Sequence, residues 1–263
     1  MRCSEWISIV YFAAMTVLGW VRPLVPARRL QITATGLAMC GAILWVSREG
    51  SAGIRDWASV GYILAGYYLS GRFFVRPSPA IERWLMSWDR RLLGDPTTRF
   101  ARWPAPLLAY LEVVYMGCVL LVPAGFAWLA ASGRSALADR YWTMVGSAEF
   151  GAFLPLALMQ TRPPWAVERP ATLPDRAVHH FAARMVRELT INANTFPSGH
   201  VAGSFAVAFA LLGPMPWTGG VCLLLAISIS VACVVGRYHY VVDGVAGVAL
   251  ALAIYGIVTA AGL

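Results

Sequence analysis

Two short stretches in the last third of this 263-residue chain carry residue types that could do chemistry. They are Asn194–His200, NTFPSGH, and Gly236–Asp243, GRYHYVVD, and each lies beside a long apolar run. In the second stretch His239 and Asp243 are four residues apart, so on a helix they share one face. A carboxylate one turn from an imidazole can fix its tautomer and stabilise its charged form. This is the arrangement of a base or nucleophile with its orienting acid.

The first stretch has the features of an anion-binding helix start. Pro197-Ser198-Gly199-His200 stands at the beginning of an apolar segment, where Ser198 can cap the helix and Gly199 leaves the backbone approachable. The N–H groups and the helix dipole at such a start favour an anion, and Arg237 adds a bidentate phosphate donor nearby. The alternative is that these polar residues only cap membrane helices. Histidine paired with aspartate at a membrane-helix end is costly without a use, which favours chemistry.

The composition indicates an integral membrane protein. The chain is 59% hydrophobic and only 13% charged, with a mean hydropathy of +0.62. All 21 basic residues are arginine, and the net charge of +8 suits anionic lipid headgroups. No nucleic-acid-binding module is visible. The five scattered cysteines form neither a disulfide framework nor a zinc-ligand spacing, and we expect them to be packing residues.

Eight apolar runs predict an all-α, polytopic membrane helix bundle with about eight transmembrane helices. We expect the first run to be a retained anchor rather than a signal peptide, because an apolar partner follows it. The sixth run would span roughly 22 Å, less than the roughly 30 Å hydrocarbon core. We expect two parts, an N-terminal two-helix hairpin at 1–50 and a six-helix catalytic core at 51–263. The runs cover about 6–22, 31–47, 57–75, 107–131, 139–160, 198–212, 217–235 and 241–262.

Two further segments predict interfacial amphipathic helices. Within 76–106, one helical face collects apolar residues, with tryptophans that suit headgroup depth: Ile81, Trp84, Leu85, Trp88 and Leu92. Within 175–190, His179 and His180 lie opposite the apolar side. Adjacent histidines on a helix cannot comfortably chelate one metal, so we interpret them as headgroup-facing. Glu112 and Glu149 lie inside apolar runs and need partners there; for Glu112 a structural role is favoured over chemistry.

Three motifs in order resemble a known family. Arg162-Pro163, Pro197–His200 and His239–Asp243 each stand at a predicted helix boundary. This order resembles the type 2 phosphatidic acid phosphatase superfamily of membrane lipid phosphatases and phosphotransferases, over about residues 80 to 255. The His-Tyr-x-x-Asp spelling and the segment Trp88–Pro96 are similar to the inositol phosphorylceramide synthase and sphingomyelin synthase branch.

The resemblance implies a role for each matching residue. It implies His239 as the nucleophile that forms a phosphohistidine, Asp243 as its orienter and His200 as the acid, with no metal or cofactor. It implies phosphate binding by Arg162, Ser198, Gly199 and a third-motif arginine. The chain departs from the family pattern twice. Pro155 stands at the usual lysine position, and Cys233 stands where the third-motif arginine is usual, which leaves Arg237 as its nearest substitute.

The predicted topology brings the motifs to one side of the membrane, because the connections alternate sides. Most of the arginines lie on that side, which by the positive-inside rule would make it cytoplasmic. The family resemblance instead leans towards the extracytoplasmic face, in the plasma membrane of a bacterium. The side is therefore left open with an outward lean, and the oligomeric state is not predicted.

Three functions are compatible with the sequence. The favoured one is an inositolphosphotransferase-like enzyme that moves a phosphoalcohol or phosphoryl group between a lipid and an alcohol. The alternative is a phosphatase acting on phosphatidic acid or a polyprenyl pyrophosphate. A remoter alternative is a transporter or scaffold that kept the fold. A transporter would more naturally show paired discontinuous helices with repeat symmetry, and the sequence shows no repeat.

Overall fold

The computed structural model describes residues 1–168, 184–185 and 188–263. Most of the predicted 175–190 helix, including His179 and His180, lies outside the described residues. Regular secondary structure in the described residues is helical, which confirms the all-α prediction. The elements are α1 (Cys3–Val21), α2 (Pro26–Glu49), α3 (Ala52–Gly71), α4 (Pro79–Leu93), α5 (Pro96–Ala101), α6 (Ala105–Ala131), η1 (Ser135–Leu137), α7 (Ala138–Phe153), η2 (Leu154–Ala157), α8 (Pro164–Val167), α10 (Gly199–Leu212), α11 (Pro216–Val235) and α12 (Val241–Ala260).

Each of the eight predicted apolar runs coincides with a helix. Several of these helices begin with a proline in the first turn, where its missing N–H has no helical partner to lose. Five helices are long and apolar enough to cross a membrane: α1, α2, α6, α11 and α12. The protein is therefore a multi-pass integral membrane protein. The count of eight spans stays a prediction, since α3, α7 and the shorter apolar α10 are not among the five.

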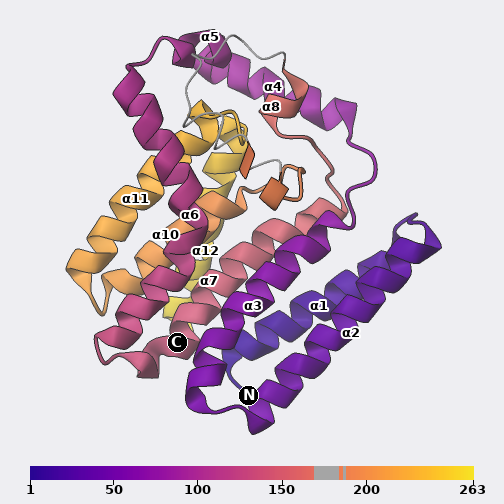
Figure 1. Ribbon diagram of the computed structural model, residues 1–263, viewed down its shortest axis with the longest axis vertical. Coiled ribbons are helices and arrows are strands. Elements are labelled where there is room, and N and C mark those ends of the chain that lie inside the picture. The colour runs from indigo at the N-terminus through magenta and orange to yellow at the C-terminus, as the bar shows by residue number, and fades with distance from the viewer. Residues whose placement is uncertain (169–183, 186–187) are drawn as a thin grey trace.

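The centre of the bundle is formed by α7 and α10. Most residues of both helices are buried, and α10 packs against α6, α7, α11 and α12. A helix enclosed by other helices need not match the bilayer thickness by itself, which accounts for the 14 residues of α10. Both chain termini lie at the end of the bundle away from α4 and α5 (Figure 1).

The N-terminal hairpin is packed into the rest of the molecule through α1. The rings of Tyr11 and Phe150 stack at 4.3 Å, and the Tyr11 hydroxyl donates to the Gly66 carbonyl at 2.8 Å. Arg55 on α3 forms a bidentate ion pair with Glu5. Residues on both sides of position 50 thus share one hydrophobic core. The division into 1–50 and 51–263 stays a prediction.

α4 lies across one end of the bundle, beside α5 (Figure 1). Ser78 caps its start and Gly94, with a φ of 75°, ends it. The predicted helix is present, but its apolar residues do not all face one way. Leu85 is buried with Glu82 and Asp89, whereas Trp84 and Leu92 are exposed. The inward face of α4 is therefore partly acidic, because both acids meet arginines beneath the helix.

Candidate active site

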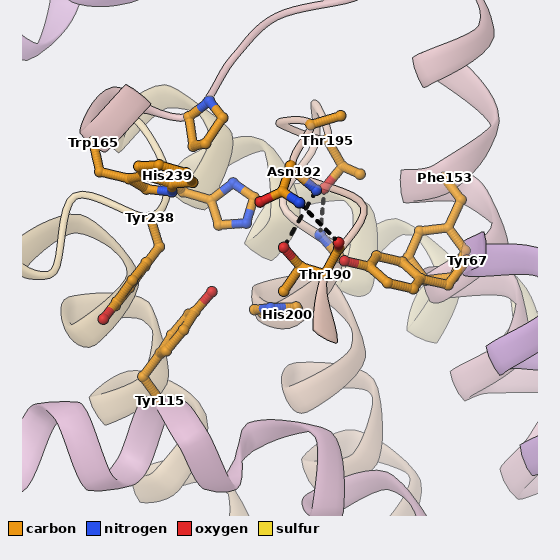
Figure 2. Close-up of a pocket in the computed structure, with 13 residues that line it drawn as sticks. Tyr67, Tyr115, Phe153, Trp165, Thr190, Asn192, Thr195, His200, Tyr238 and His239 are labelled. Atoms are coloured by element: carbon orange, nitrogen blue, oxygen red, sulfur yellow. Dashed lines mark hydrogen bonds between the residues drawn. The ribbon is translucent and has the colours of Figure 1, made fainter. Parts of the chain in front are cut away.

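The three sequence motifs meet at one pocket (Figure 2). Pro163 comes from the first motif, Gly199 and His200 from the second, and Tyr238 and His239 from the third. Three helices complete the walls with one aromatic residue each, α3 with Tyr67, α6 with Tyr115 and α7 with Phe153. The remaining lining residues are Trp165 and four residues of the 190–195 segment: Thr190, Asn192, Ala193 and Thr195.

Hydrogen bonds between the motifs hold them together. Asn194, at the start of the second motif, donates its backbone N–H to the carbonyl of Thr161, beside the first motif, at 2.8 Å. The Ser198 N–H donates to the Asp243 carbonyl at 3.0 Å and so joins the second motif to the third. The Tyr240 hydroxyl donates to the Arg162 carbonyl at 3.2 Å and joins the third to the first. The alternation of the helix connections predicted that the three motifs meet, and in the structure they are in contact.

His239 and Asp243 form the predicted imidazole–carboxylate pair. His239 Nδ1 lies 3.4 Å from Asp243 Oδ2, and both side chains are buried. The same carboxylate oxygen accepts the Tyr240 N–H at 2.9 Å, so the start of α12 fixes its position. A distance of 3.4 Å is long for a hydrogen bond, as catalytic contacts often are before substrate binds. Asp243 therefore faces Nδ1 of His239, and Nε2 is the other ring nitrogen.

His200 faces His239 across the pocket. The two ring centroids are 5.7 Å apart, and the His200 ring also lies 5.4 Å from that of Tyr115 (Figure 2). His200 belongs to the first turn of α10, which Ser198 caps by accepting the Val201 N–H at 3.4 Å. Ser198 is fully buried in this capping role, whereas Gly199 lines the pocket.

Aromatic rings enclose the two histidines, and the sequence analysis did not anticipate them. Tyr115 and Tyr238 stack at 3.8 Å on one side, while Tyr67 and Phe153 pack at 5.5 Å on the other (Figure 2). The only sequence signal was the position of Tyr238 next to His239. Because these rings come from α3, α6, α7 and the third motif, their meeting depends on the packing of distant helices.

Each predicted phosphate-binding arginine is paired with carboxylates. Arg162 donates to Glu82 through its backbone N–H, Nε and Nη2, at 2.9, 3.0 and 2.9 Å. Arg237 donates to Glu168 through Nε and Nη2, and its Nη1 lies 2.8 Å from Asp89 Oδ2. Neither arginine is among the described residues that line the pocket. Sequence reasoning missed these three acids, because their partners are distant along the chain.

The pairing changes the titration of the acids on α4. Burial works against the charge of Glu82, but the hydrogen bonds from Arg162 hold its pKa below the ordinary value of 4.5. Burial raises the pKa of Asp89 above its ordinary value, against the opposing effects of the Val241 N–H and Arg237. For Arg237, the two carboxylates outweigh burial and raise the pKa, so its charge is retained.

The two positions that depart from the family pattern lie outside the pocket lining. Pro155 belongs to η2, where it cannot replace a lysine charge. Cys233 is buried on α11, and its carbonyl accepts the N–H groups of Tyr238 and His239 at 2.9 and 3.0 Å. Cys233 therefore supports the turn that carries His239 through its backbone. Among the described residues, no group of three or more His, Cys, Asp or Glu side chains has the arrangement of a metal site.

A family model described as the PAP2 superfamily matches residues 83–257, well over half of the chain. The chain belongs to the PAP2 superfamily. Its members are phosphatases or phosphotransferases, which supports an enzyme acting on lipid phosphates in a membrane. No match was found among curated proteins or among solved structures. The PAP2 match begins within α4, leaves α1–α3 outside, and contains every residue of the three motifs.

Proposed function

We propose that the protein is a lipid phosphotransferase that works through a phosphohistidine on His239. The observation that carries the proposal is the His239–Asp243 pair facing His200 across one pocket. A nucleophile, its orienting acid and a second proton-carrying group are the parts that two-step phosphoryl transfer needs. All of them lie at the ends of helices of a membrane protein, where a lipid phosphate can reach them.

In the first step, Nε2 of His239 attacks phosphorus and the bond from phosphorus to the leaving alcohol oxygen breaks. His200 gives its proton to that oxygen, while Asp243 stabilises the charge on the His239 ring. In the second step, an acceptor alcohol attacks phosphorus and His200 takes its proton. The N–P bond breaks and His239 is regenerated. Water in place of the second alcohol would give hydrolysis.

The proposed phosphate-binding residues are Arg162, Ser198, Gly199 and Arg237. The first turn of α10 offers the positive end of its dipole to an anion at Gly199. The arginines would contribute their positive charge from beside the pocket, because Glu82 and Glu168 already occupy the Nε–Nη2 edge of each guanidinium in a bidentate manner. The mechanism assigns no metal ion or cofactor to the reaction.

The types of residue that line the pocket favour transfer over hydrolysis. Apart from the two histidines, its described lining is uncharged: five aromatic rings, the hydroxyl or amide groups of Thr190, Asn192 and Thr195, and the small or apolar residues Pro163, Ala193 and Gly199. Aromatic walls help to exclude water, and hydroxyl and amide groups suit a polyol such as inositol. Membership of the PAP2 superfamily supports a lipid phosphate phosphatase equally well, so phosphatidic acid or polyprenyl pyrophosphate hydrolysis is the alternative.

The purified protein should be given phosphatidylinositol or phosphatidic acid, with and without diacylglycerol, ceramide or free inositol, and with His239→Ala as the inactive control. A new phosphoalcohol product that forms only when a second alcohol is present would support transfer. Release of inorganic phosphate from phosphatidic acid, unaffected by any added alcohol, would show that the phosphatase alternative is correct.

A further inference from the structure

We propose that Asp89 is a positioning residue that holds both ends of the turn carrying His239. This role rests on the proposed function, in which His239 is the nucleophile. Asp89 is fully buried on α4, far from the third motif along the chain. Its Oδ1 accepts the Val241 N–H at 2.8 Å, and its Oδ2 lies 2.8 Å from Arg237 Nη1. Arg237 and Val241 stand two residues before and two residues after His239.

The turn needs such a support because it lies between two helices rather than inside one. α11 ends at Val235 and α12 begins at Val241, and Arg237 between them has a left-handed φ of 59°. A non-glycine residue adopts that conformation only when its surroundings impose it. The Cys233 carbonyl holds the first half of the turn, and the Asp243 carboxylate holds the second. Asp89 contacts both halves.

α4 is itself fixed in place, so Asp89 can act as a rigid point of reference. Glu82 lies seven residues earlier, two turns along the same buried face, and binds Arg162 through three donors. Leu85 between the two acids is fully buried. A shift of α4 would have to break both acidic contacts together, which makes a sliding motion costly.

The two contacts of Asp89 can be removed separately. Asp89→Asn keeps an oxygen for the Val241 N–H but loses the negative charge beside Arg237. Val241→Pro removes the N–H and puts a ring carbon in its place, so it pushes Asp89 Oδ1 away from the turn while the carboxylate keeps its charge. Val241 is the first residue of α12, a position that proline favours, and Tyr240 before it has φ −73° and ψ 154°, which suits a residue preceding proline. The backbone can therefore accept this change.

The measurement is the rate of phosphoenzyme formation, by rapid quench, from ³²P-labelled dioctanoyl phosphatidic acid and ³²P-labelled phosphatidylinositol. Asp95→Asn is the matched control, because Asp95 is an exposed cap of α5 and asparagine caps equally well. We expect Asp89→Asn and Val241→Pro to slow phosphorylation of His239 about 10- to 100-fold, as a misplacement of about 1 Å does. KM should change less than about threefold, because Arg237 keeps its charge and its bidentate pair with Glu168 in both variants.

Two results would overturn the positioning role alone. One is phosphorylation at the wild-type rate in both variants. The other is a loss of substrate binding in step with turnover and a lowered melting temperature, which would mark Asp89 as a merely structural residue. If Asp89→Asn fails to fold, the phosphorylation rate, KM and melting temperature of Val241→Pro provide the test. A wild-type enzyme that acquires no label on His239 from either lipid would overturn the proposed function, and the positioning role with it.

Discussion

Arg237 and Glu168 form a bidentate ion pair, with Nε and Nη2 at 3.0 and 2.7 Å from the two carboxylate oxygens. The third nitrogen of the same guanidinium faces Asp89 on α4. One buried cation thus joins α4, the segment after α8 and the turn that carries His239. The Arg237 side chain is only 6% exposed, and the fully buried Asp89 depends on it for compensation of its charge.

Replacing Arg237 with methionine should therefore destabilise the protein strongly. The change leaves Asp89 buried without a cation, and removal of one partner from a buried pair costs about 3–5 kcal/mol. Thermal unfolding in detergent, followed by tryptophan fluorescence, measures the effect. Arg90→Met is the matched control, since Arg90 is exposed on α4, next to Asp89 in the sequence. A change in Arg237→Met no larger than that of Arg90→Met would contradict the structural account of the pair.

The Glu82–Arg162 pair should make stability depend on pH in the acidic range. The pKa of Glu82 in the folded protein lies below its ordinary value of 4.5. The pair therefore stabilises the folded state fully above that value, and its contribution is lost as the pH falls through the lower, folded pKa. Glu82→Gln removes this titration. Between about pH 6 and 3.5, the melting temperature of the wild type should fall more steeply than that of Glu82→Gln; parallel curves would argue against the ion pair.

Gly203 on α10 allows the close approach of Glu149 on α7. A Cβ at position 203 would overlap the Glu149 carboxylate. We expect Gly203→Ala to cost about 1–3 kcal/mol, the usual range for overpacking. In a Glu149→Ala background the same change should cost much less, because the obstructing group is gone. A double-mutant cycle of thermal stabilities tests this; additive effects would show that the two residues do not meet.

The side of the membrane can be tested in the turn after α6. Ser132 is exposed there, at the end of α6 opposite to the pocket. Under the outward lean, Ser132→Cys should resist a membrane-impermeant thiol reagent in intact cells, while Thr98→Cys on α5 should react. Both variants are made with Cys3→Ser, which removes a partly exposed cysteine near the N-terminus. Labelling at position 132 but not at 98 would place the site on the cytoplasmic face.

The sequence predicted most of the helices because a membrane-spanning helix needs a long run of apolar residues, which is visible locally in the sequence. The alternation of the connections between these helices then predicted that the motifs meet on one side. The start of α10 at Ser198 and Gly199 followed from the Pro-Ser-Gly-His turn. His239 and Asp243 are in contact, but not on one helix face as the spacing predicted, because His239 lies in the turn before α12 begins at Val241. The carboxylate partners of Arg162 and Arg237 could not be predicted from the sequence. Glu82 and Asp89 interrupt an otherwise apolar pattern, and their inward orientation depends on Arg162 and Arg237, which lie far along the chain. Long-range pairs of this kind leave no periodic signal.

The proposed mechanism requires that His239 carries the phosphoryl group. The most direct measurement is to quench the purified enzyme during turnover of a ³²P-labelled lipid and to map the labelled residue by mass spectrometry. Asp243→Asn should slow label formation by as much as about 10⁴-fold through the wrong tautomer and lost charge stabilisation, and His239→Ala should abolish it. We expect an acid-labile phosphohistidine at position 239 in the wild type. Full turnover by His239→Ala, or a label on another residue, would contradict it.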